Sequence, residues 1–122
     1  MTSCSSTFTA ADEAVVIPIS PAEAARLHNR AGVEFVDPRP EEVISATTGR
    51  IPGGRVIPLS RIEAGDLPPA FADRSIHVVT SCQAGPMAAR AAAAFSKLGF
   101  ARVSYVSGGT QAWVDAGLPT VR

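Results

Sequence analysis

Short apolar segments alternate with helix-like segments along most of this chain. Five segments rich in β-branched and aromatic residues predict strands, over residues 15–19, 33–36, 55–57, 76–80 and 102–106. The intervening stretches predict helices over 20–32, from residue 60 to 65, over 87–98 and over 110–116, with one helical turn over 41–44. Strands that alternate with helices are typical of an α/β fold with a parallel sheet.

Two of the predicted helices carry local start signals. Ser20 precedes Pro21 and has Glu23 three residues later, which predicts a capping box at the first helix. Ser60 is expected to cap a short helix that ends at Gly65.

The pattern predicts one domain with helices on both faces of the sheet. The segment over 76–80 is apolar enough to be a central strand, buried on both faces. We expect this domain to span residues 15–122, since no linker or repeat interrupts it. Residues 1–14 are small, polar and aperiodic, so we expect a flexible tail there.

Composition and charge exclude several function classes. Eleven basic and eleven acidic side chains give a net charge of +0, which argues against nucleic-acid binding and gives no support for attraction to anionic membranes. Neither a signal peptide nor a membrane span is visible, so we expect a cytoplasmic protein. Two cysteines, Cys4 and Cys82, are too few for a disulfide scaffold or a zinc site of the CxxC type. We expect no metal and no organic cofactor, because metal-ligand spacings and nucleotide-binding motifs are absent.

Cys82 is the candidate nucleophile. It lies just past the predicted strand over 76–80 and before the predicted helix over 87–98, where ligands bind in parallel α/β sheets. Backbone N–H groups of such a loop and of the first helical turn have no intrahelical partner, so they can surround an anion or a thiolate. Cysteines at helix N-termini become nucleophilic for this reason. Gly85 suits the tight loop. A buried structural cysteine is the alternative interpretation.

Four separated motifs, in the same order, resemble those of single-domain rhodaneses, a family of sulfurtransferases. They are Asp37-Pro38-Arg39 with Glu41-Glu42, Gly49-Arg50-Ile51-Pro52-Gly53-Gly54, the loop Cys82-Gln83-Ala84-Gly85, and Val106-Ser107-Gly108-Gly109 with Trp113 and Gly117-Leu118-Pro119. The resemblance covers about Val15 to Val121. It implies a rhodanese-like α/β fold with a five-stranded parallel sheet of order 1-5-4-2-3.

The resemblance implies sulfur transfer by Cys82. The thiolate would take a sulfane sulfur from a donor, either a small sulfur-containing anion such as thiosulfate or a persulfide, and pass it to cyanide, a small thiol or a protein thiol. The backbone amides of the active-site loop would stabilise the anionic sulfur; they belong to Gln83, Ala84, Gly85, Met87 and Ala88. A binding or sulfur-carrier module that docks a partner protein is the alternative function.

The active-site loop departs from the family pattern C-x-x-G-x-R-S at two positions. Met87 stands where the family has arginine, and Ala88 where it has serine. Pro86 also lacks an N–H to donate. We therefore expect weak thiosulfate activity and a donor that is less anionic than thiosulfate, or a protein persulfide. Arg90, three residues after Met87, is a candidate for supplying the missing charge, and an ordinary surface arginine is the alternative.

Other candidates fit structural roles better. A related phosphatase would need arginine at position 88 to complete C-x5-R, and Ala88 excludes that class. The resemblance suggests that Asp37 and Arg39 pair with nearby chain and hold the fold; that they line the same crevice as Cys82 is the alternative. Trp113 is expected to close the core. His77 is expected to be a satisfied strand residue, and His28 to lie at the surface.

Overall fold

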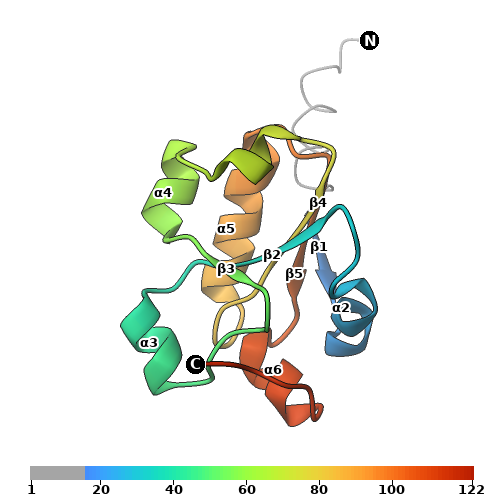
Figure 1. Cartoon of the computed structure of the whole chain (residues 1–122), viewed down its shortest axis with the longest axis vertical. Helices are drawn as coiled ribbons and strands as arrows, with labels where there is room; N and C mark the ends of the chain where they lie inside the picture. Colours follow the sequence, from blue (N-terminus) through green and yellow to red (C-terminus); the bar gives the residue numbers. More distant parts are fainter. Residues whose placement is uncertain (1–15) are drawn as a thin grey trace.

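The computed structural model describes residues 16–122, so the expected tail over 1–14 and Cys4 lie outside the described residues. Helices and strands alternate along the chain (Figure 1). The elements are β1 (Val16–Ile19), α2 (Pro21–Leu27), β2 (Val33–Asp37), α3 (Glu41–Ala46), β3 (Arg55–Val56), α4 (Leu59–Ala64), the 3₁₀ helix η1 (Pro69–Ala72), β4 (His77–Thr80), α5 (Pro86–Lys97), β5 (Arg102–Val106) and α6 (Gly109–Asp115).

The five strands form one parallel sheet of order β1-β5-β4-β2-β3. This confirms the α/β class and the strand order that the family resemblance implied. β4 is central, as its composition predicted, and its neighbouring residues Val78 and Val79 are both fully buried on opposite faces of the sheet.

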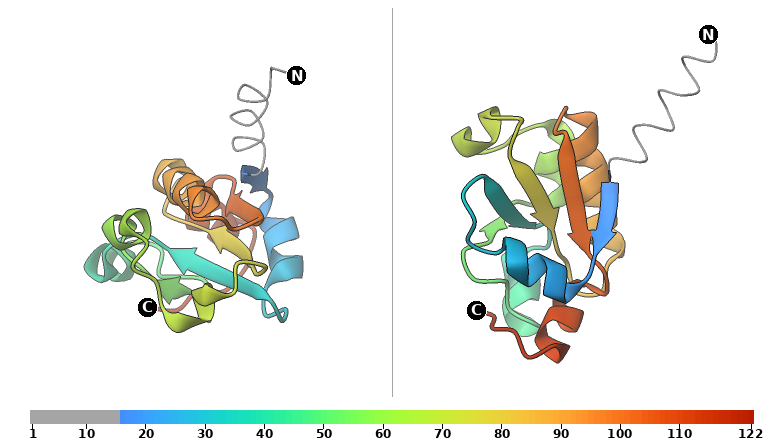
Figure 2. Two further views of the ribbon diagram at one scale, coloured as in Figure 1. Left: turned by 90° about the horizontal axis from the view of Figure 1, so that it is seen from above. Right: turned by 90° about the vertical axis from the view of Figure 1, so that its right-hand side faces the viewer.

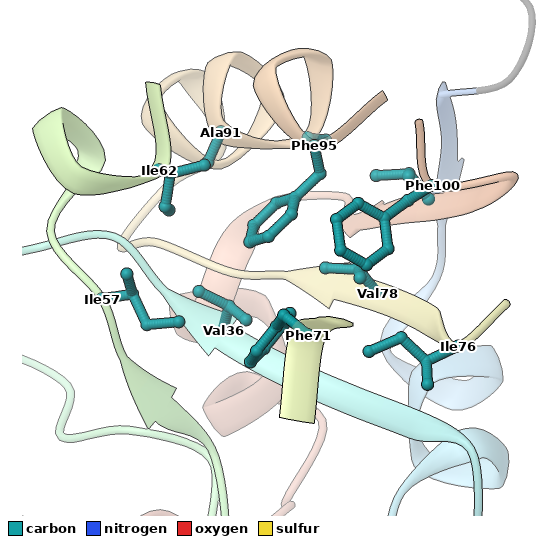
Figure 3. Packing of buried hydrophobic residues seen from close by; sticks show 11 residues of the cluster. Val36, Ile57, Ile62, Phe71, Ile76, Val78, Ala91, Phe95 and Phe100 are labelled. Atoms are coloured by element: carbon teal, nitrogen blue, oxygen red, sulfur yellow. The ribbon is translucent and has the colours of Figure 1, made fainter. Parts of the chain in front are cut away.

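Helices cover both faces of the sheet, with α4 and α5 on one side and α2 and α6 on the other (Figure 2). On the α4–α5 side, Phe71, Phe95 and Phe100 pack with ring centroids 5.4–6.2 Å apart (Figure 3). Ala91 and Ala92 are fully buried against the sheet, and their small side chains let α5 lie close to it.

Trp113 anchors the core on the other face. It is 1% exposed, as expected, and its Nε1 donates to the carbonyl oxygen of Pro119 at 2.7 Å. His28 packs edge-on against Phe35 and Trp113, with both ring centroids 5.6 Å away, and its Nε2 lies 2.7 Å from the carbonyl oxygen of Pro52. The expectation of a surface His28 is therefore wrong: α2 ends at Leu27, so the next residue turns inward.

Helix starts follow local signals only in part. The capping box of α2 is confirmed, since Ser20 Oγ accepts from the Glu23 N–H at 3.1 Å and Glu23 accepts from the Ser20 N–H at 2.8 Å. The expected cap at Ser60 is wrong, because α4 begins at Leu59 and its N-cap is Pro58, two residues before Ser60. There the Leu59 N–H donates to the carbonyl oxygen of Pro38, a tertiary contact that fixes the start of α4.

Candidate active site

Cys82 lies in the loop between the carboxyl end of β4 and the first turn of α5. Its Sγ accepts two backbone hydrogen bonds, from the N–H of Gly85 at 3.1 Å and from the N–H of Ala88 at 3.3 Å. The residue is a free cysteine and only 3% exposed. The sulfur therefore lies in a small cradle of N–H groups that favours negative charge on it.

Gly85 gives the loop its shape. It is the N-cap of α5 and has φ +133°, a backbone conformation that side-chain-bearing residues rarely adopt. No atom lies within 4 Å of where a Cβ would stand, so conformation rather than space requires glycine here. This turn brings the Gly85 N–H back onto the sulfur three residues earlier.

Buried hydroxyls tie the start of α5 to the sheet. The Thr80 hydroxyl, on the last residue of β4, donates to the carbonyl oxygen of Ala88 at 2.7 Å, and Thr80 is fully buried. The Ser81 N–H donates to the carbonyl oxygen of Val36 on β2 at 3.0 Å. The two residues that precede Cys82 are thus held by the first turn of α5 and by β2.

The first turn of α6 holds the loop from the other side. The Thr110 N–H donates to the Cys82 carbonyl oxygen at 2.6 Å, and the Gln111 N–H donates to the Gln83 carbonyl oxygen at 3.0 Å. The hydroxyls of Ser81 and Thr110 lie 2.7 Å apart and share a hydrogen bond. A Cβ on Gly109 would stand 2.6 Å from the Cys82 carbonyl oxygen, so only glycine permits this approach.

Thr110 and Gln111 were missed in the sequence. The Ser107-Gly108-Gly109 segment belongs to one of the family motifs, but the loop that it contacts lies more than 20 residues earlier in the chain. Two consecutive glycines before a helix were the available signal, since they permit close backbone approach.

The structure brings two of the five predicted loop amides to the sulfur, those of Gly85 and Ala88. Among the residues described, the amides of Gln83, Ala84 and Met87 make no hydrogen bond to Sγ, so their contribution stays a prediction. The side chain of Met87 is 38% exposed.

The two arginines singled out in the sequence both have carboxylate partners. Arg90 donates to Glu63 of α4 through Nε at 2.8 Å, and its contribution to anion binding stays a prediction. The buried Arg39 forms a bidentate pair with Asp37, at 3.0 and 2.7 Å. Arg39 also donates to the loop over 47–49, so this pair holds the fold as expected.

The described residues, 16–122, contain neither a cluster of metal ligands nor a membrane-spanning helix. Nowhere in this range do three or more His, Cys, Asp or Glu side chains gather to hold a metal ion. None of its helices is both long and apolar enough to cross a membrane.

Comparisons with known proteins agree with the fold. The family model of the rhodanese-like domain matches residues 20–116. No curated protein matches the chain.

Three solved structures illustrate the similarity. A protein of unknown function from Rhodopseudomonas palustris, described as a possible tyrosine phosphatase, is 27% identical, with 90% of this chain and 88% of that chain covered and a TM-score of 0.80. A rhodanese-related protein from Thermoplasma volcanium is 27% identical, with 86% and 97% covered and a TM-score of 0.68. A thiosulfate sulfurtransferase from Pseudomonas aeruginosa is 26% identical, with 84% and 19% covered and a TM-score of 0.70.

Proposed function

The chain belongs to the family of rhodanese-like domains, and on this premise we propose that it is a sulfurtransferase that carries a sulfane sulfur on Cys82. The similarity to the P. aeruginosa thiosulfate sulfurtransferase supports the reaction class, although this chain covers only 19% of that protein. The phosphatase description of the R. palustris protein is not carried over, because Ala88 holds the position where C-x5-R needs arginine.

In the first half-reaction, the Cys82 thiolate attacks the sulfane sulfur of the donor. A Cys82–sulfur bond forms, and the bond between the sulfane sulfur and the rest of the donor breaks. The donor remainder leaves with that electron pair, as sulfite from thiosulfate or as a thiolate from a persulfide. The N–H groups of Gly85 and Ala88 stabilise the thiolate before attack.

In the second half-reaction, an acceptor takes the outer sulfur of the Cys82 persulfide. An acceptor thiolate, or cyanide, bonds to the outer sulfur while the bond to Sγ breaks, which regenerates the Cys82 thiolate. The anchoring of the loop to α6 supports this step. Because the carbonyls of Cys82 and Gln83 face α6, the N–H groups of the same peptides, on Gln83 and Ala84, face the opposite way. There they are free to stabilise the outer sulfur.

The observation that carries this proposal is the pair of hydrogen bonds to the Cys82 sulfur. Mass spectrometry of the full chain, after incubation with thiosulfate or a thiol persulfide, tests it directly. We expect one added sulfur atom on Cys82, removable by cyanide or a thiol. Cys82→Ser should gain none, and Cys4→Ser should gain it as the wild type does. We place this chemistry in a reducing cytoplasm, where free thiols persist.

The neutral loop and the low exposure of Cys82 favour a second candidate, a module that docks a partner protein. The same experiment separates the two. If neither donor adds sulfur to Cys82, while Cys82→Ser leaves a partner complex intact, the docking module is supported and the sulfurtransferase is rejected.

A further inference from the structure

The loop that carries Cys82 and the turn that leads into α6 are both neutral. The exposed side chains of its own loop and of the turn that leads into α6 carry no charge; they belong to Gln83, Ala84, Pro86, Met87, Ser107 and Gln111. A donor that approaches the sulfur therefore meets amide, hydroxyl, thioether and aliphatic groups.

The arginines near the loop have partners within the fold. Arg50, which lines a cavity with Ser81 and Thr110, donates through Nε to the carbonyl oxygen of Gly54 at 3.3 Å. Arg90 is bound to Glu63, and Arg39 is buried in its pair with Asp37. Within the described part of the chain, no arginine or lysine side chain is hydrogen-bonded to the Cys82 sulfur; its two donors are backbone N–H groups.

Burial makes this lack of cations consequential. Cys82 is 3% exposed, so the part of a donor that reaches the sulfur leaves most of its water. A desolvated charge needs a partner, and backbone amides supply only partial positive charge. Thiosulfate carries two negative charges within a few bonds of the atom that is attacked. The amide cradle has no full charge to set against the second of them.

From this arrangement we infer that Cys82 takes sulfur from thiol persulfides rather than from dianionic donors such as thiosulfate, and that Met87 sets this preference. The inference rests on the proposed function. In the preferred step, the Cys82 thiolate attacks the outer sulfur of R–S–SH and a bond forms between Sγ and that sulfur. The S–S bond of the donor breaks, and R–S⁻ leaves with its electron pair. The reacting end of a persulfide bears at most one charge.

Met87 is the specificity-determining position because of its place on α5. The peptide that joins Met87 to Ala88 carries one of the two N–H groups that reach the sulfur. The Met87 side chain is 38% exposed and lies in the first turn of α5, where a charged replacement can be accommodated. A cation introduced here would stand beside the anion-binding turn.

The test compares rates of Cys82 persulfide formation from thiosulfate and from glutathione persulfide at equal concentrations, followed by mass spectrometry. For the wild type we expect the persulfide rate to exceed the thiosulfate rate by about tenfold or more, the effect of one charged hydrogen bond. Met87→Arg should reduce this ratio by about tenfold, through faster reaction with thiosulfate. Ala93→Arg is the matched control: it adds the same charge at an exposed site farther along α5 and should keep the wild-type ratio.

The outcomes are distinguishable. Equal or faster reaction with thiosulfate in the wild type, or a ratio that Met87→Arg leaves unchanged, overturns the inference and leaves the sulfurtransferase intact. A similar shift with Ala93→Arg also overturns it, since net charge would then explain the effect. If neither donor adds sulfur to Cys82 in the wild type or in Met87→Arg, the proposed function itself fails.

Discussion

Thr110 binds two consecutive residues of the candidate active site at once. Its N–H donates to the carbonyl oxygen of Cys82 at 2.6 Å, and its hydroxyl lies 2.7 Å from that of Ser81. Both Ser81 and Thr110 are buried, so neither hydroxyl can exchange its partner for water. Thr110 of α6 thus links the residue that follows β4 to the loop that carries Cys82.

The hydroxyl pair should show strong coupling in a double-mutant cycle. Thr110→Val or Ser81→Ala alone leaves a buried hydroxyl without its partner and should lower the free energy of unfolding by about 1–3 kcal/mol. The double variant removes both hydroxyls and should be more stable than the sum of the two losses implies. Urea unfolding of the four proteins measures the coupling. Strictly additive losses would show that the two hydroxyls do not depend on each other.

Gly109→Ala should damage both the fold and the site. Its φ of +69° disfavours any side chain, and the new Cβ would stand 2.5 Å from the Gln83 carbonyl oxygen. We expect the backbone strain to lower the free energy of unfolding by about 1–3 kcal/mol, and the close contact to add to this loss. We also expect slower sulfur loading of Cys82.

Gly117→Ala is the control for backbone strain alone. Gly117 also has a positive φ, +84°, but nothing lies within 4 Å of its missing Cβ. Unfolding and mass spectrometry should show strain without slower loading in this variant. Equal effects of the two substitutions would mean that the close approach of α6 to the loop is not required.

Removal of Arg39 should be among the most destabilising single changes. Arg39→Met leaves the buried Asp37 carboxylate without its bidentate partner, and we expect a loss of about 3–5 kcal/mol in unfolding free energy. Arg61→Met breaks the exposed pair with Asp66 and should change that energy by less than about 0.5 kcal/mol. Comparable losses by chemical denaturation would contradict a structural role for the buried pair.

His77 should make the fold less stable in acid. Burial and, to a lesser extent, the Arg102 charge hold the pKa of His77 below its ordinary value. The unfolded chain therefore binds the proton more readily, so the stability contributed by neutral His77 is complete above about pH 6.5 and is lost as the pH falls through the folded pKa. His77→Gln, which can keep a hydrogen bond to Ser104, should lose less stability between about pH 7.5 and pH 5 than the wild type.

Thermal unfolding at several pH values measures the difference between these two proteins. Every other titratable group is common to both, so its contribution cancels. The same pH dependence in the two proteins would assign the effect to another residue.

Much of the fold could be predicted because its signals are local. Residues Ser20 and Glu23 fix the start of α2 within four residues, as the sequence predicted. The starting point of α4 could not be read locally, because it depends on a hydrogen bond from Leu59 to Pro38, 21 residues away. The strand order came from the family resemblance, since alternation alone does not order strands.

The candidate site also combines features that could be predicted locally with contacts that could not. Cys82 could be placed at a helix N-terminus because strand, loop and helix are contiguous in the sequence. The contact between Thr110 and Cys82, and the pairing of Arg90 with Glu63, join residues that are 28 and 27 positions apart. Such contacts depend on which strands are neighbours and how helices cross, and local patterns do not contain that information.

The anchoring of the reactive loop to α6 has a consequence for protein engineering. The two hydrogen bonds from α6 to Cys82 and Gln83 are accepted by their backbone carbonyl oxygens, so neither requires a particular side chain at position 83. The exposed side chains at positions 83, 84 and 87 can therefore be randomised in a library without removing the contacts that hold the sulfur. Under the proposed function, we expect selection from such a library to change the choice of donor while Cys82 stays in place.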